Sequence, residues 1–215
     1  NMLLYLDVYS QFYLPIDCDD IYRHDNSSAS GVYTVFPGGP TSPLHAHRDV
    51  DTDGGGWTLI QRRMDGTQNF YRPWKHYKEG FGNVANLSYV LSGLENIFLL
   101  TVRKKNELRV DMEDWEGGKA YAHYASFSID PESYSYQPHL GSFTGGDAGV
   151  GLAVGWYNTC HYSNPNGMYA PTNAIAFENS HVIWQHWKGW NDSHKSIAMK
   201  IRAVSGCKEK HRHKD

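Results

Sequence analysis

Glycine and proline divide this chain into short segments, and this limits the folds that it can adopt. The 215 residues include 21 glycines and nine prolines, residue types that interrupt helices and end strands. Glycine is densest between Gly141 and Gly155, where the sequence is typical of loops. We therefore expect short helices at most, and a helix bundle is excluded.

The clearest strand signal lies at residues 107–113, where three apolar side chains alternate with four charged ones. A period of two is typical of an antiparallel strand that buries one face and exposes the other. We interpret the charged pair Asp111 and Glu113 as part of a solvated strand edge rather than as a catalytic carboxylate pair. Other segments with β-type composition are residues 31–36, 57–63, 121–129 and 197–204.

Local signals also predict one hairpin and two short helices. Asp65 and Gly66 separate the strand at 57–63 from the aromatic pair Phe70 and Tyr71, which indicates a hairpin turn. Apolar residues with helical spacing, which predict the helices, are Trp74 with Tyr77, and Leu94 with Ile97 and Phe98.

Charge and hydropathy exclude two classes of partner. The formal net charge is −3, and the tail from Cys207 onward holds four basic and two acidic residues, so the rest of the chain carries −5. A body of this sign has no electrostatic reason to bind nucleic acid or an anionic membrane surface. No apolar run reaches the roughly 18 residues that a membrane-spanning helix needs. We expect no nucleic-acid partner and no membrane span.

Two patterns are similar to metal sites. Residues 49–54 have the aspartate spacing that opens an EF-hand loop, but the closing carboxylate position holds Ile60. His45 and His47 would point the same way on a strand, yet the sequence places no third zinc ligand near them. We therefore interpret the aspartates as a turn before a strand and predict no metal at either place.

The sequence contains no arrangement of nucleophile and base that is typical of an enzyme. It has no G-x-S-x-G elbow and no H-E-x-x-H helix. Cys160 and His161 are adjacent, but neighbours on an extended chain point to opposite faces. Aromatic residues late in the chain, such as Trp184, are core candidates, with stacking on a sugar or acetyl group as the alternative. We predict a non-enzymatic protein.

Cysteines and glycosylation sequons bear on the cellular compartment. Cys18, Cys160 and Cys207 are too few for a disulfide scaffold, and their spacing fits no zinc or redox motif. Asn-x-Ser/Thr sequons favour secretion. The predicted glycosylation sites are Asn26, Asn86 and Asn191.

Several motifs follow one another in an order that one known family shares. They are Asp17-Cys18-Asp19-Asp20-Ile21-Tyr22, Gly54-Gly55-Gly56-Trp57-Thr58-Leu59-Ile60-Gln61-Arg62-Arg63, Asn69-Phe70-Tyr71-Arg72-Pro73-Trp74, Cys160-His161-Tyr162-Ser163-Asn164 and Trp187-Lys188-Gly189-Trp190. Together they resemble the fibrinogen C-terminal-type domain over about residues 17–204, and within that family its microfibril-associated branch.

The resemblance implies an α+β fold, with a mixed, mostly antiparallel sheet, short helices and a loop-rich C-terminal subdomain. It implies three regions: an N-terminal leader or fragment at residues 1–16, the fibrinogen C-terminal-like domain at 17–205, and a basic disordered tail at 206–215. It also implies a secreted module of the extracellular matrix.

The chain departs from the family pattern at its disulfides and its calcium site. The position that would pair with Cys18 holds Arg48. Between residues 149 and 156 only six residues bridge a gap where the family has a longer segment, with the calcium loop and the cysteine that pairs with the equivalent of Cys160. By this comparison both family disulfides lack a partner and the calcium site is deleted, so we expect no cofactor. In an oxidising compartment we expect cysteines without a family partner to form intermolecular bonds or pairs that the family does not have.

The pocket that binds acetyl groups in the family is also reduced. Its histidine matches His161, a family tyrosine falls at Gly151, and a Tyr-Ala pair falls near residues 178–179. The ligand-binding candidates that remain are Tyr157, Thr159, Cys160, His161 and Trp184.

The sequence therefore predicts a secreted recognition module that binds acetylated glycans or matrix glycoproteins, weakened by loss of the calcium loop, and able to form homo-oligomers. The alternative is a structural protein of microfibrils that acts through protein–protein contacts and has no small-ligand pocket.

Overall fold

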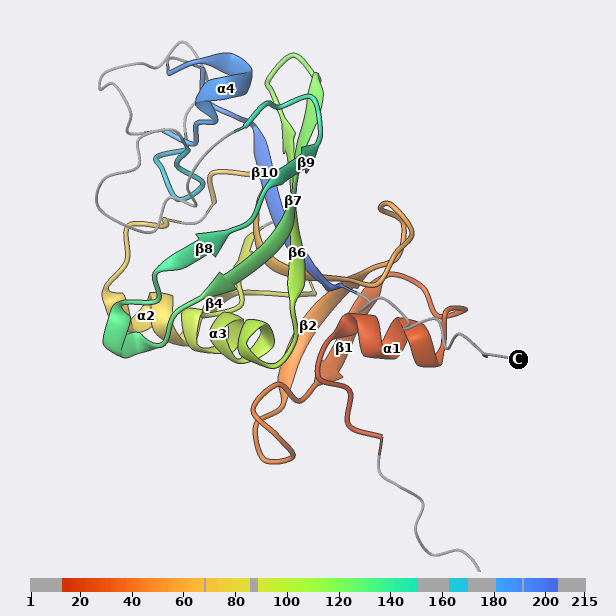
Figure 1. Ribbon diagram of the computed structural model, residues 1–215. Coiled ribbons are helices and arrows are strands. Elements are labelled where there is room, and N and C mark those ends of the chain that lie inside the picture. Colours follow the sequence, from red (N-terminus) through yellow and green to blue (C-terminus); the bar gives the residue numbers. More distant parts are fainter. Residues whose placement is uncertain are drawn as a thin grey trace, which may run out of the picture.

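Among the residues that the structure describes, ten strands form one sheet at the centre of the molecule (Figure 1). The computed structural model describes residues 13–67, 69–85, 89–150, 163–169, 181–190 and 192–204. The main path of the sheet is β1 (Gly31–Val35), β2 (Leu44–Asp49), β3 (Trp57–Arg63), β10 (Ser196–Ala203), β6 (Asn106–Glu113), β7 (Lys119–Ile129) and β8 (Pro138–Leu140). Beside this path lie β4 (Phe81–Gly82), β5 (Tyr89–Leu91) and β9 (Phe143–Gly145).

The last strand of the described chain lies in the middle of this sheet. β10, the blue strand in Figure 1, pairs with β3 on one side and with β6 on the other. All pairings between the named strands are antiparallel, and one isolated parallel bridge joins Met168 to His181. The strands expected from composition are confirmed, and so is the mostly antiparallel α+β class.

The predicted hairpin after β3 is wrong. β3 pairs with β2, β5 and β10, and residues 69–73 belong to no strand. Phe70 instead packs edge-on against Phe81, with ring centroids 5.1 Å apart, and the Arg63 guanidinium lies 4.4 Å from its ring centroid. Burial of the Phe70 ring outweighs the local turn signal, because aromatic burial is worth more than a turn preference.

The two helices that the spacing predicts are confirmed as α2 (Trp74–Glu79) and α3 (Leu94–Arg103). The structure also contains α1 (Cys18–His24), α4 (Gln185–Lys188) and one 3₁₀ turn at Glu132–Tyr134, which the spacing did not predict. α3 lies against one face of the sheet (Figure 1) and buries Leu94, Ile97 and Leu100 there. The sheet contributes alternate residues to the same core: Leu108, Val110, Met112, Ile197, Met199 and Ile201.

The interpretation of Asp111 and Glu113 as a solvated strand edge is also wrong. They point away from the core, as expected, but β6 lies inside the sheet between β10 and β7. Asp111 lies 2.8 Å from the ammonium of Lys200, and Glu113 lies 2.8 Å from that of Lys195. Periodicity reveals which face of a strand is buried, but it does not reveal which strands lie beside it.

Residues 49–54 form the expected turn before β3. The Asp49 carboxylate accepts hydrogen bonds from the backbone N–H groups of Asp51 (2.9 Å) and Thr52 (3.1 Å). Its second oxygen accepts from the Lys200 ammonium at 2.6 Å. Within the described ranges, no group of three or more His, Cys, Asp or Glu side chains has the geometry to hold a metal ion.

Cys18 and Arg48 are fully buried next to each other in the N-terminal part. The backbone N–H of Cys18 donates to the Thr58 hydroxyl at 3.0 Å, and Thr58 lies opposite Arg48 in the β2–β3 pairing. Burial raises the pKa of the Cys18 thiol to about 12. A buried, protonated thiol does not react with another chain, so the expected intermolecular pairing is wrong for Cys18. Cys160 and Cys207 lie outside the described residues.

Candidate binding site

The face of the sheet opposite α3 is polar. Side chains directly opposite one another in an antiparallel pair share a face, so the register lines up residues from several strands. One row across β2, β3, β10, β6 and β7 consists of His47, Leu59, Lys200, Arg109 and His123. The next row consists of Arg62, Ala198, Asp111 and Tyr121.

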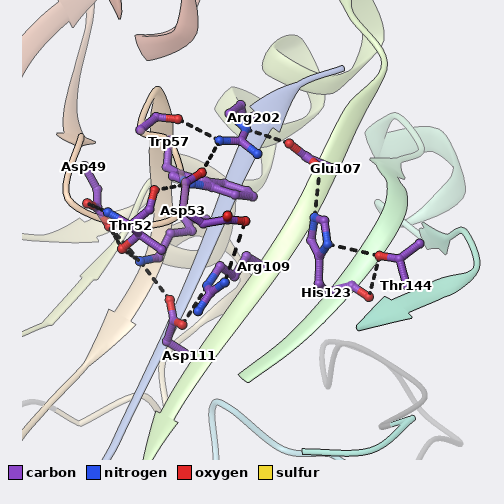
Figure 2. A network of polar contacts seen from close by, with 12 residues as sticks. Asp49, Thr52, Asp53, Trp57, Glu107, Arg109, Asp111, His123, Thr144 and Arg202 are labelled. Carbon is purple, nitrogen blue, oxygen red and sulfur yellow. Dashed lines mark hydrogen bonds and ion pairs between the residues drawn. The ribbon is translucent and has the colours of Figure 1, made fainter. Parts of the chain in front are cut away.

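Lys200 is the centre of the first part of a polar network. Its partners Asp49, Thr52 and Asp111 lie close together in Figure 2. The Lys200 ammonium lies 2.6 Å from Asp49, 2.8 Å from Asp111 and 3.0 Å from the Thr52 hydroxyl. Burial alone would raise the pKa of Asp49, but the hydrogen bonds from Lys200 and Thr52 outweigh it and lower that pKa to about 2. The Asp49 carboxylate is therefore charged at neutral pH, and its contact with Lys200 joins the turn after β2 to the sheet.

Arg202 forms the second part of the network. Its Nε donates to Glu107 at 2.6 Å, and one terminal nitrogen donates to the backbone oxygens of Asp53 (2.6 Å) and Gly55 (2.9 Å). The guanidinium also stacks 4.2 Å from the ring centroid of the fully buried Trp57. These contacts hold the glycine-rich turn against β10.

Glu107, His123 and Thr144 form a chain of carboxylate, imidazole and hydroxyl, which Figure 2 shows beside the Arg202 contacts. The Glu107 carboxylate lies 2.9 Å from Nε2 of His123, and the Thr144 hydroxyl lies 3.0 Å from Nδ1. This order is the one that hydrolases use to activate a hydroxyl. Here the Thr144 hydroxyl donates to the backbone oxygen of His123 at 3.2 Å, and Glu107 is shared with Arg202. The chain therefore fastens β9 to the sheet rather than preparing a nucleophile.

A groove of about 770 Å³ crosses this polar face. Its bottom follows β10, where the small side chains of Ser196 and Ala198 leave space between longer neighbours. Arg62 on β3 forms one side, and Asp111 and Tyr121 on β6 and β7 form the other. The Tyr121 ring is covered by Arg109, whose guanidinium carbon lies 3.9 Å from the ring centroid. Most of the residues that line the groove carry a hydrogen-bonding side chain, and the groove offers little open aromatic surface.

Of the predicted ligand-binding residues, the structure describes only Trp184, which does not line this groove. Trp184 is 4% exposed, immediately before α4, and its indole belongs to the core cluster. Its role as a ligand contact stays a prediction. Asn26 is exposed directly after α1. The predicted residues outside the described part of the chain are Tyr157, Thr159, Cys160, His161, Asn86 and Asn191.

Sequence reasoning missed the groove because it depends on strand register. The only local signal was the pair of small residues Ser196 and Ala198 within the last strand. Nothing in the sequence places them opposite β3 and β6.

An antiparallel sheet with one helix-covered face and one grooved polar face defines this protein as a globular domain of the fibrinogen type. The family model "Fibrinogen beta and gamma chains, C-terminal globular domain" matches residues 14–155 and 150–204. The chain belongs to this family, which confirms the resemblance found in the sequence.

Curated relatives agree with this assignment. The chain is 38% identical over 221 residues to Microfibril-associated glycoprotein 4 of Bos taurus, covering 88% of this chain and 85% of the relative. The Homo sapiens protein of the same name is 38% identical over 220 residues, covering 87% and 85%. Fibrinogen C domain-containing protein 1 of Xenopus tropicalis is 36% identical over 220 residues, covering 87% of this chain and 47% of the relative.

Solved structures share the fold. The fibrinogen-like globe domain of human ANGPTL6 has a TM-score of 0.81 and 33% identity, covering 90% of this chain and 97% of that domain. The corresponding domain of human ANGPTL2 has a TM-score of 0.80 and 34% identity, covering 89% and 100%. None of the described helices is both long and apolar enough to cross a membrane.

Proposed function

We propose that this chain is a secreted, non-enzymatic recognition module that binds glycans or matrix glycoproteins. The observation that carries the proposal is the polar groove, on a sheet face where hydrogen-bonding side chains converge in a domain of the fibrinogen family. Small-ligand sites are concave and hold a few convergent polar groups. The Glu107 carboxylate of the polar chain at Thr144 is shared with Arg202, which favours a structural role for that chain over catalysis.

The names of relatives support an extracellular role. The curated relatives include microfibril-associated glycoproteins. A lamprey fibrin D-dimer with the same fold, 27% identical and with a TM-score of 0.78, was solved with a peptide ligand. We extend extracellular recognition from these proteins to this chain, with Asn26 as an accessible glycosylation site.

We further propose that the family calcium loop is missing and that the acetyl pocket is weakened. The family model matches in two pieces that overlap at residues 150–155. The alignment to the bovine relative runs over 221 positions but covers only 88% of a 215-residue chain, so it contains gaps on this chain's side. Both observations are expected if a segment is absent near residue 150. His161 would then be the main remnant of the acetyl pocket.

Calorimetry and a glycan array test this function. The probes are N-acetylglucosamine and an array of acetylated and matrix glycans, each with calcium and with chelator. We expect binding to a subset of glycans without calcium dependence, and N-acetylglucosamine binding no tighter than millimolar. Calcium-dependent binding tighter than millimolar would contradict the missing loop. No bound glycan or matrix glycoprotein at all would contradict the recognition function.

A structural role in microfibrils is the second candidate, and exposed aromatic side chains favour it. Tyr71 is 95% exposed, Tyr134 is 69% exposed and Trp74 is 43% exposed. Exposed aromatic residues are enriched where proteins contact one another. Sedimentation and non-reducing electrophoresis of the full chain separate the candidates, because a purely monomeric protein that binds glycans excludes the assembly role.

A further inference from the structure

Arg62 differs from the cations around it in the groove. It lies on β3 opposite Ala198 of β10, and its side chain is only partly buried. Lys200 is paired with Asp49 and Asp111, and Arg109 is paired with Asp111 at 2.8 Å. Arg62 makes no hydrogen bond and no ion pair with the part of the chain that the structure describes.

Arg62 is partly withdrawn from water, and no residue that the structure describes forms a hydrogen bond with its guanidinium. Burial lowers the pKa of Arg62, against the opposing effect of Asp49 and Asp111. Burial, and the positive charge of Arg62 beside it, lower the pKa of His47, so His47 is neutral at pH 7 and Arg62 carries the local positive charge. A guanidinium offers five N–H donors in a planar fork that matches a carboxylate. The groove therefore presents an unfilled site for one carboxylate.

The size of the groove fits one saccharide unit beside Arg62. Ala198 separates Arg62 on β3 from Asp111 on β6. Adjacent strands lie about 4.8 Å apart, so the backbones of β3 and β6 are separated by about 10 Å. A methyl group at Ala198 fills little of that width, and a single sugar ring or extended chain fits between the walls.

The charges of the groove select the class of ligand. Five carboxylates line it, beside four cations: Asp49, Asp51, Asp111, Glu113 and Asp147, with Arg62, Arg109, Lys119 and Lys200. This near balance of charge gives no attraction to a highly charged polyanion. A polyol gains hydrogen bonds from the same carboxylates. An acidic peptide would need apolar subsites for its side chains, and the Tyr121 ring on the far side of the groove is already covered by Arg109. A hydroxyl-rich ligand with a single carboxylate per recognised unit fits best.

We propose that the groove binds an acidic saccharide, with the carboxylate of one sugar paired to the guanidinium of Arg62 and its hydroxyls bonded along β10 and β6. The proposal rests on the proposed function and adds the ligand class and the residue that recognises it. Uronic and sialic acids share this chemistry.

Isothermal titration calorimetry of the full chain tests the proposal, with the methyl glycoside of galacturonic acid, a monosaccharide with one carboxylate, as the first probe. This probe carries no acetyl group, so it reports on the groove separately from the acetyl pocket. Its methyl ester, which lacks the negative charge, is the control ligand. Sialyllactose is the second probe and distinguishes the two sources of carboxylate.

Arg62→Gln removes the cation and keeps a polar side chain of similar length. The matched control is Arg103→Gln, because Arg103 is exposed at the end of α3 and does not line the groove. We expect Arg62→Gln to weaken binding of an acidic probe about tenfold to a hundredfold, which is typical of losing a charged hydrogen-bonded pair. Arg103→Gln should bind like the wild type, and the methyl ester should bind at least tenfold more weakly than the acid. Circular dichroism and thermal unfolding verify that both variants fold.

Three results would overturn the proposal. These are equal affinity of Arg62→Gln and wild type, equal affinity for the acid and its methyl ester, and no binding of either acidic probe at millimolar concentration. Each of them leaves glycan-array binding unaffected, so a failure of this proposal is distinguishable from a failure of the recognition function.

Discussion

At the scale of single residues, Arg48 shows how one side chain takes over a structural position. Its guanidinium lies between the rings of Tyr22 and Tyr33, at 5.5 and 5.1 Å from their centroids. One terminal nitrogen donates to the backbone oxygens of Asp25 (3.2 Å) and Ser28 (2.7 Å). These contacts join the chain after α1 to β2, next to Cys18, where the family resemblance implies a disulfide.

We expect Arg48→Ala to lower the free energy of unfolding by about 3 kcal/mol, because it removes buried volume and charged hydrogen bonds together. Urea unfolding monitored by tryptophan fluorescence measures the change. The control is Arg23→Ala, since Arg23 pairs with Asp19 at 2.6 Å but its side chain is 52% exposed, and exposed pairs contribute up to about 1 kcal/mol. A loss below about 1 kcal/mol for Arg48→Ala would contradict the structural role.

At the scale of elements, a register shift decides which residues reach the groove. Leu59 and Arg62 are three residues apart, so a regular strand would place them on opposite faces. The β3–β10 register shifts between Met199 and Lys200 and leaves Ile60 without a partner on β10. This bulge brings Leu59 and Arg62 to the same polar face.

His194 makes the segment between α4 and β10 sensitive to acid. It is fully buried, and its ring lies 5.0 Å from that of Trp187 on α4. Burial lowers the pKa of His194 to about 4, although Asp114 opposes the shift. An unfolded histidine titrates near pH 6.5. Between these two pH values the unfolded state binds a proton at His194 that the folded state does not. The contribution of neutral His194 to the free energy of unfolding is therefore fully present above about pH 6.5 and is lost as the pH falls towards 4.

We expect the free energy of unfolding to fall by up to about 3 kcal/mol between pH 7 and pH 4, because the unfolded state is protonated at His194 and the folded state is not. Urea unfolding at several pH values measures this loss. His194→Phe keeps the ring contact with Trp187 and removes the titration, so its pH dependence should be flatter. His76→Gln, at an exposed position on α2, should behave like the wild type. Identical pH profiles for His194→Phe and wild type would show that another group causes the acid sensitivity.

At the scale of the whole molecule, the sheet separates the apolar core on one face from the polar groove on the other. α3 and the apolar residues of β6 and β10 form the core on one face, and charged residues of the same strands form the groove on the other. Stability therefore depends on packing and ion pairs within the chain, and ligand contacts do not require the core to change.

We expect calcium to leave the thermal stability unchanged. A ligand stabilises a protein only if it binds the folded state, and we propose that the calcium loop is missing. Differential scanning fluorimetry with millimolar calcium or millimolar EDTA should give the same Tm within about 1 °C. A site saturated a hundredfold above its Kd would add about 2.7 kcal/mol and raise Tm by about 5 °C or more, which would contradict the missing loop.

The sequence predicts local elements of this protein well. The alternation at residues 107–113 and the spacing at Leu94 and Ile97 depend on neighbours a few positions apart, and β6 and α3 follow them. The hairpin at Phe70 and the edge position of Asp111 were wrong because distant segments compete for the same strand or ring.

The sequence by itself determined the longer strands β3, β6, β7 and β10 with β1, the helices α2 and α3, and membership of the fibrinogen family, since these follow from periodicity, composition and ordered motifs. Only the tertiary structure decided that Arg48 is buried against α1 and that Arg62 faces a groove above β10. Both results depend on strand register and on contacts between residues far apart in the chain, and such contacts leave no periodic signal in the sequence.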